Sequence, residues 1–127
     1  QYDEAMSILA SLDLANVAYS AIAGLPYGKL RLVEVGIALA LKPRVLLLDE
    51  PAAGVSSSES HLITDAIAGL SSDISVLIIE HNMDVVFRFA NRITVLDGGR
   101  VLASGAPQEI ARNEEVKARY LGKAEHV

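Results

Sequence analysis

Two apolar segments, each ending in charged residues, constrain the fold of this chain more than any other feature. The first reads VLLLDE and spans residues 45–50, and the second reads SVLIIE and spans residues 75–80. A strand that is apolar at almost every position is typical of a sheet covered on both faces, as parallel sheets usually are. We therefore predict two buried parallel strands, at residues 44–49 and 75–80, with both faces of their sheet covered.

The segment between these strands carries the signals of a helix. Ser56 and Glu59 have the S-x-x-E spacing of a capping box, which predicts a helix over residues 57–70. A strand, a helix and a second strand in this order form a βαβ unit. The fold class predicted from the residues is therefore α/β, with a parallel βαβ core.

The flanking segments are predicted to add helices and one hairpin. Gly and Pro interrupt the chain at GLPYG, residues 24–28, and Pro43 stops the helix that follows this break. The glycine pair Gly98-Gly99 predicts a tight turn between two antiparallel strands. The elements expected are one or two helices in residues 1–23, a helix at 29–41, a short helix at 81–90, a hairpin at 92–105 and two short helices in 107–121.

Composition narrows the classes of protein that remain. The chain has 127 residues, a hydrophobic fraction of 51%, a net charge of -5 and no cysteine. A single domain is expected from the length, and more apolar surface than the chain buries by itself is expected from the composition. The absence of a basic patch argues against a general binder of nucleic acid or anionic membranes. The first residue is not methionine, which suggests a piece of a longer protein.

Charged residues stand at the point where each predicted strand ends. The first strand ends in Asp49 and Glu50, and the second ends in Glu80 and His81. Ligands of open parallel sheets bind at this edge. One carboxylate can hold Mg²⁺ through water, a second can activate water, and a histidine can contact a phosphate. Each residue alone also fits an ordinary solvated strand end, but the four together favour phosphoryl transfer to water.

A phosphate-binding loop is missing from the sequence. None of the nine glycines begins the pattern G-x-x-x-x-G-K-[ST]. The segment LPYGKLR offers a glycine at the start of a helix, where backbone N–H groups favour a phosphate, although the same residues fit a simple turn. No G-x-S-x-G occurs either, which argues against an α/β-hydrolase.

The order of these motifs resembles a known family. LPYGK, VLLLDE, AAGVS and His81 are similar to the signature motif, Walker B, D-loop and switch histidine of ABC transporter nucleotide-binding domains. The resemblance covers nearly the whole chain and implies a partial P-loop NTPase (ABC ATPase) fold. The segments IEHNMDVV and GAPQEIARNEEVKARYLG resemble ATP-binding subunits of branched-chain amino-acid importers. Lipopolysaccharide-export ATPases have a similar tail and remain an alternative.

The resemblance also implies a division of the chain. Residues 1–127 would be the C-terminal part of an ABC ATPase domain. Residues 1–43 would be the end of the helical subdomain with the signature motif. Residues 44–127 would hold the Walker B, D-loop, switch histidine and C-terminal part. The Walker A motif and Q-loop of the family are absent from these residues.

Roles follow from the resemblance residue by residue. Asp49 would hold Mg²⁺ through water, Glu50 would be the catalytic base, and His81 would contact the γ-phosphate. The signature residues would reach, in trans, ATP bound to the opposite subunit, and the D-loop would pack across the dimer interface. The signature residues are Leu25, Pro26, Tyr27, Gly28 and Lys29, and the D-loop residues are Gly54, Val55 and Ser56.

The implied cofactors are ATP and Mg²⁺. The implied partners are a second ATP-binding subunit, identical or different, membrane permease subunits and, indirectly, a substrate-binding protein. The location would be peripheral, at the cytoplasmic face of the membrane, and the chain by itself is expected to be inactive and to self-associate. Pro26 stands where the family has serine, and Ser56 stands where it has an acid. These departures keep a non-catalytic dimerisation or interaction module as an alternative.

Overall fold

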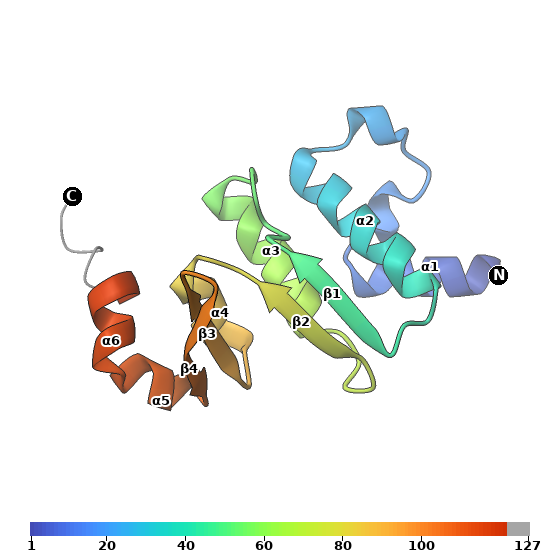
Figure 1. Ribbon diagram of the computed structural model, residues 1–127. Helices are drawn as coiled ribbons and strands as arrows, with labels where there is room; N and C mark the ends of the chain where they lie inside the picture. Colours follow the sequence, from blue (N-terminus) through green and yellow to red (C-terminus); the bar gives the residue numbers. More distant parts are fainter. Residues whose placement is uncertain (122–127) are drawn as a thin grey trace. The chain divides into compact units, whose positions relative to one another are not determined.

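The computed structural model describes residues 1–121, which are shown in Figure 1. The chain divides into two compact units, the first from Gln1 to Ile79 and the second beginning at Glu80. This division follows the packing of the chain, whereas the segments 1–43 and 44–127 follow its motifs.

The first unit contains the predicted βαβ arrangement. β1 and β2 form a parallel pair, with Val45 opposite Ser75 and Asp49 opposite Ile79. The parallel strands are connected through α3, which confirms the α/β prediction. The elements are α1 (Tyr2–Ser11), two 3₁₀ turns (Ala15–Val17 and Ile22–Gly24), α2 (Tyr27–Ala40), β1 (Val45–Asp49), α3 (Ser57–Ala68) and β2 (Ser75–Ile79).

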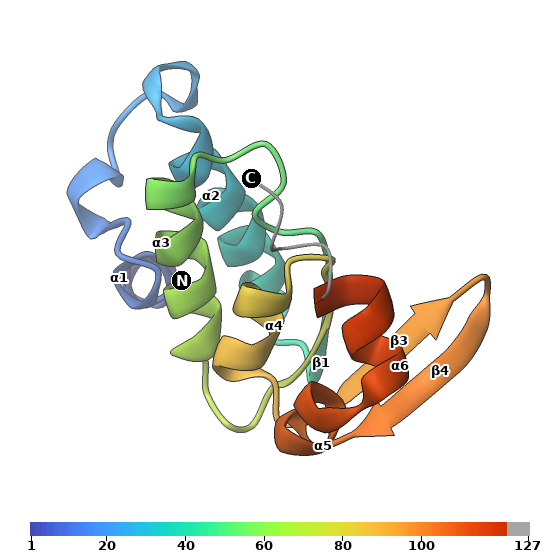
Figure 2. The same cartoon turned by 90° about the vertical axis from the view of Figure 1, so that its left-hand side faces the viewer.

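The core of the first unit lies between its helices and one face of the sheet. Side chains of α2 and α3 contact each other there, and Figure 2 shows the two helices side by side. Leu46 and Leu48 point from β1 into this core, as Val76 does from β2. The fully buried or nearly buried apolar residues are Leu12, Leu14, Leu32, Val35, Leu46, Ile63 and Ile67.

The opposite face of the same sheet is exposed. Leu47 is 68% exposed and Leu77 is 60% exposed, and Val45 and Ile79 are similarly open. The prediction that both faces are covered is therefore wrong for the residues that the structure describes. The reason is that α1, α2 and α3 contribute to one hydrophobic cluster, which lies on the Leu46 side of the strands.

The end of α2 is fixed by a backbone reversal. Lys42 adopts φ 52°, in the left-handed region that commonly follows a helix, and Pro43 prevents the helix from continuing. The Lys42 ammonium lies 2.6 Å from a carboxylate oxygen of Glu4 in α1. This hydrogen bond raises the pKa of Lys42 above its ordinary value. The contact connects the end of α2 to the first turn of α1.

The second unit is a helix, a hairpin and a helical tail. The hairpin strands are antiparallel, and Gly98 (φ 55°) and Gly99 (φ 76°) form its turn, as predicted. Ile93, Val95, Ile110 and Val116 form the buried core. The elements are α4 (Met83–Phe89), β3 (Ile93–Asp97), β4 (Arg100–Gly105), α5 (Pro107–Arg112), α6 (Glu114–Val116) and a short π-helix (Lys117–Leu121).

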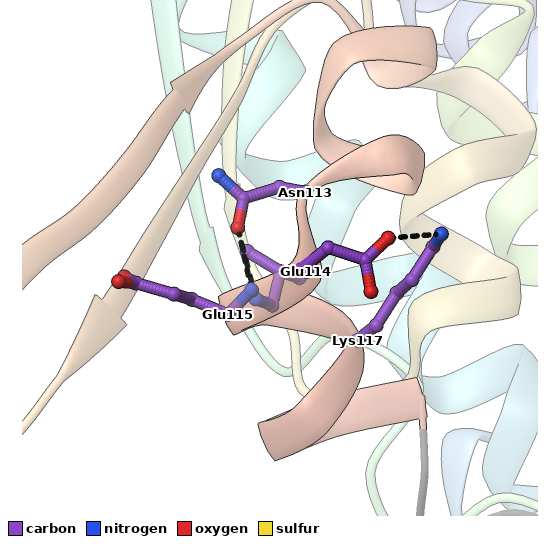
Figure 3. Close-up of polar contacts among 5 residues, drawn as sticks. Asn113, Glu114, Glu115 and Lys117 are labelled. Carbon is purple, nitrogen blue, oxygen red and sulfur yellow. Dashed lines mark hydrogen bonds and ion pairs between the residues drawn. The ribbon is translucent and has the colours of Figure 1, made fainter.

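Asparagine side chains begin two helices of this unit. The Oδ1 atom of Asn113 accepts hydrogen bonds from the backbone N–H groups of Glu115 (3.0 Å) and Val116 (3.1 Å). Figure 3 shows this cap beside the ion pair of Glu114 and Lys117, in which Oε1 of Glu114 lies 2.9 Å from Nζ of Lys117. Asn82 caps α4 in the same way. Such caps satisfy backbone donors that a helix leaves unpaired at its start.

Candidate functional site

The candidate site begins where β1 ends. The backbone N–H of Glu50 donates to the carbonyl of Ile79 at 2.9 Å, one residue beyond the last strand pair. Glu50 then adopts φ 42°, and its carbonyl accepts from the N–H of Ala53 at 2.9 Å. A left-handed conformation of a residue other than glycine costs roughly 1–2 kcal/mol and is often found at functional sites. The chain therefore leaves the sheet abruptly at Glu50.

The two acids of this turn have different surroundings. Asp49 is exposed on the open side of the strand pair, whereas Glu50 is half-buried at the turn. Because Asp49 pairs with Ile79, β1 and β2 end at the same edge, as the sequence predicted. The residues that the structure describes contain no group of three or more acids or histidines placed so that it could hold a metal ion. A single carboxylate can still hold Mg²⁺ together with water, and Asp49 has the oxygen chemistry for this.

The loop after Glu50 lies against the start of α2. Gly54 has φ 75°, which only glycine adopts readily. A Cβ at Gly54 would lie 3.4 Å from the Cε1 atom of Tyr27, the first residue of α2. The N–H of Val55 donates to the carbonyl of Ala52 at 3.2 Å and closes the turn. The segments LPYGK and AAGVS, distant in sequence, are therefore neighbours.

The remaining residues of the two segments have distinct environments. Gly28 is buried, and a Cβ there would lie 3.2 Å from the Cβ of Glu59 in α3. Ser56 donates through Oγ to a carboxylate oxygen of Glu59 at 2.9 Å. Lys29 donates through Nζ to Oδ1 of Asn16 at 3.4 Å. Leu25 is half-buried and Pro26 is exposed before the helix.

The sequence does not single out Arg31 or Glu59 as a site residue, although both lie beside predicted ones. The Arg31 guanidinium lies 5.2 Å from the centroid of the Tyr27 ring. Its hydrogen bond to the Glu34 carboxylate, at 2.8 Å, is the main cause that raises the pKa of Arg31. Tyr27 precedes Arg31 by four residues and Glu34 follows it by three. These spacings bring side chains together on a helix and are the signal that could have revealed the contacts of Arg31.

Glu80 and His81 belong to the second unit. Glu80 accepts a long hydrogen bond, 3.5 Å, from the backbone N–H of Asn82. His81 follows β2 by two residues and is exposed. Because His81 and Glu50 belong to different units, the approach of one to the other stays a prediction.

Comparison with known proteins agrees with the motifs. Residues 100–126 match a family model described as "Branched-chain amino acid ATP-binding cassette transporter". The chain is 37% identical over 118 residues to the branched-chain amino acid transport ATP-binding protein BraF of Pseudomonas aeruginosa, covering 91% of this chain and 46% of BraF. It is 36% identical to LivG of Salmonella typhimurium, covering 96% of this chain and 49% of LivG.

Solved structures give the same result for the fold. The ADP conformation of an ATP-binding cassette of an ABC transporter superposes with a TM-score of 0.82 at 30% identity, covering 94% of this chain and 49% of that chain. The chain thus has the fold of part of an ABC transporter ATP-binding cassette. Within that class, BraF and LivG are ATP-binding proteins of branched-chain amino-acid transport, and the matching family model describes the same kind of transporter. These findings confirm the resemblance inferred from the motifs.

The chain corresponds to only part of each relative. The chain spans about half the length of the curated relatives that it matches, 46% of BraF and 49% of LivG. Within residues 1–121, none of the helices has the length and apolar character needed to span a bilayer.

Proposed function

We propose that this chain is part of the ATP-hydrolysing subunit of an ABC transporter, which energises import of branched-chain or other hydrophobic amino acids. The turn at Glu50 is the observation that carries this proposal. It places a half-buried carboxylate one residue after an exposed one, at the edge where two parallel strands end. Ligands of such sheets bind at that edge.

Asp49 and Glu50 take different roles in this proposal. Asp49 would hold Mg²⁺ through water, and the ion would neutralise charge on the phosphates of ATP. Glu50 would orient a water molecule and accept its proton as a general base. The left-handed backbone conformation of Glu50 supports this assignment, because it turns the chain out of the direction of β1 at that residue. His81 would contact the γ-phosphate.

The signature and D-loop segments would act across a dimer interface. The first N–H groups of α2, at Tyr27, Gly28 and Lys29, have the orientation and dipole that favour an anion. These groups would approach ATP on a second ATP-binding subunit, and Gly54, Val55 and Ser56 would pack against that subunit. Permease subunits at the cytoplasmic face of the membrane would be the other direct partners, and a substrate-binding protein an indirect one.

The first test compares the 127-residue chain with the protein from its complete reading frame. We expect phosphate release from MgATP by the complete protein and none above background by the chain alone, since the chain lacks a Walker A loop. In membrane vesicles with its permease, the complete protein should support leucine uptake that depends on ATP. Robust ATP hydrolysis by the chain alone would contradict the expectation that hydrolysis requires a Walker A loop. A complete protein that dimerises without hydrolysing ATP would support a non-catalytic module instead.

The open face of the sheet leads to a second prediction. The chain alone should self-associate through the exposed apolar side chains of Val45, Leu47, Leu77 and Ile79. The outer edges of β1 and β2, which pair with no further strand among the described residues, add a second route to association. Sedimentation velocity at high protein concentration should detect dimers or larger species. Leu47→Thr combined with Leu77→Thr should shift the distribution toward monomer.

A matched control uses the other unit. Leu96 is 60% exposed on β3, and Leu96→Thr should leave the distribution unchanged. A wild-type chain that stays monomeric over the whole concentration range would contradict association through the open face.

A further inference from the structure

The side chain of Tyr27 contacts Gly54, and the roles proposed above for these two residues do not use this contact. One edge of the Tyr27 ring lies beside Gly54, where a Cβ would be 3.4 Å from Cε1, 3.9 Å from Oη and 4.0 Å from Cζ. These are van der Waals distances, and the positive φ of Gly54 is the feature of this position that favours glycine. The ring thus adds a side-chain contact to a turn whose backbone hydrogen bonds join Ala53 to Glu50 and Val55 to Ala52.

The Tyr27 ring is itself held by a neighbour one helical turn along. Arg31 places its guanidinium 5.2 Å from the ring centroid, a geometry typical of a cation–π contact. Glu34 holds the same guanidinium through a 2.8 Å ion pair. The Nε atom of Arg31 is buried and has no hydrogen-bond partner among the described residues.

A second contact connects the same two segments. Gly28 packs against Glu59, because a Cβ at Gly28 would lie only 3.2 Å from the Glu59 Cβ. Glu59 in turn accepts from Ser56 at 2.9 Å. Consecutive residues of α2 therefore contact the loop at Gly54 and the helix that follows it. Two contacts of this kind fix an orientation, whereas one would permit rotation about the contact.

We propose that Tyr27 is a positioning residue that holds the D-loop segment, residues 54–56, in a fixed orientation relative to the first turn of α2. The role rests on the proposed function, in which both segments face the same second subunit. The side chain of Tyr27 acts through Gly54, whereas the approach to the nucleotide is made by the backbone N–H groups of α2. Removing the ring should free the loop, so that the two segments no longer reach their productive arrangement together.

Hydrogen exchange tests the positioning directly and without reference to activity. In the protein from the complete reading frame, Tyr27→Ala should increase exchange of the Ala53 and Val55 amides by about tenfold, as expected for a loop whose local opening has become easier. Tyr27→Phe keeps the ring and should stay close to wild type. The control Tyr19→Ala removes an 82% exposed tyrosine elsewhere in the unit and should change neither amide.

The global fold is monitored in the same experiment. Exchange at the amide of Ile63, in the buried core, should be equal in all variants if the effect is local. Unchanged protection of Ala53 and Val55 in Tyr27→Ala would overturn the proposal. An equal increase at Ile63 would also overturn it, because the ring would then support the fold as a whole.

Kinetics separate the positioning role from the proposed function. Tyr27→Ala should lower kcat for ATP by about five- to tenfold with little change in KM, and Tyr27→Phe should restore kcat, since an interaction needed only in the productive arrangement affects kcat. A complete protein without ATPase activity would refute the proposed function and leave the exchange result to decide the contact. A rise in KM with unchanged kcat would contradict positioning and indicate a role in nucleotide binding.

Discussion

Glu50→Gln should reduce ATP hydrolysis by the complete protein by about 10²- to 10⁴-fold, the contribution typical of a positioned general base. The amide retains the size and hydrogen-bonding reach of the carboxylate but cannot accept the proton of the attacking water. Because only this step is removed, binding of MgATP should change by no more than about twofold. Phosphate release under saturating ATP, with nucleotide binding measured in parallel, checks both expectations.

The control for this substitution is another glutamate in the first unit. Glu4→Gln removes a carboxylate of α1 that contacts Lys42 after the end of α2, and it should leave hydrolysis unchanged. Thermal unfolding of both variants tests whether the backbone at Glu50, with φ 42°, tolerates the amide, and we expect the two midpoints to be similar. If a folded Glu50→Gln variant hydrolysed ATP at the wild-type rate, Glu50 would not be the general base.

The elements that could be predicted are those with strong local signals. Two apolar runs separated by a helix indicated the parallel βαβ unit, because β1 and β2 are each too apolar to face water on both sides. Gly98 and Gly99 identified the hairpin, since both adopt positive φ. Pro107 begins α5 as predicted, because its missing N–H is not needed at that position.

The features that escaped prediction depend on contacts between distant residues. The apolar pattern of β1 indicates that Leu47 can be buried, but it cannot say whether any segment of this chain covers it. The left-handed backbone of Glu50 has no sequence signal, because such conformations are typical of glycine. The contact of Tyr27 with Gly54 joins residues far apart in the chain, which no periodicity describes. For His81, whose neighbours depend on how the units meet, the role remains a prediction.

Ile63→Ala should destabilise the first unit by about 2–5 kcal/mol, the range observed when a buried isoleucine is truncated. Ile63 is fully buried and belongs to the cluster that joins α3 to Leu46 of β1. The loss combines the transfer of the removed methylene groups with the cavity left in a close-packed core. Since domains are stable by about 5–15 kcal/mol, the midpoint of urea unfolding, followed by circular dichroism, should fall markedly.

Leu62→Ala is the matched comparison, because it changes the neighbouring residue of the same helix. Leu62 is 50% exposed, so its truncation should cost less than about 1 kcal/mol. Alanine has the highest helix propensity and favours both variants slightly, which means that propensity cannot explain a larger loss at Ile63. The difference between the two midpoints therefore measures burial against β1. Equal losses would mean that α3 does not present its Ile63 side to the sheet.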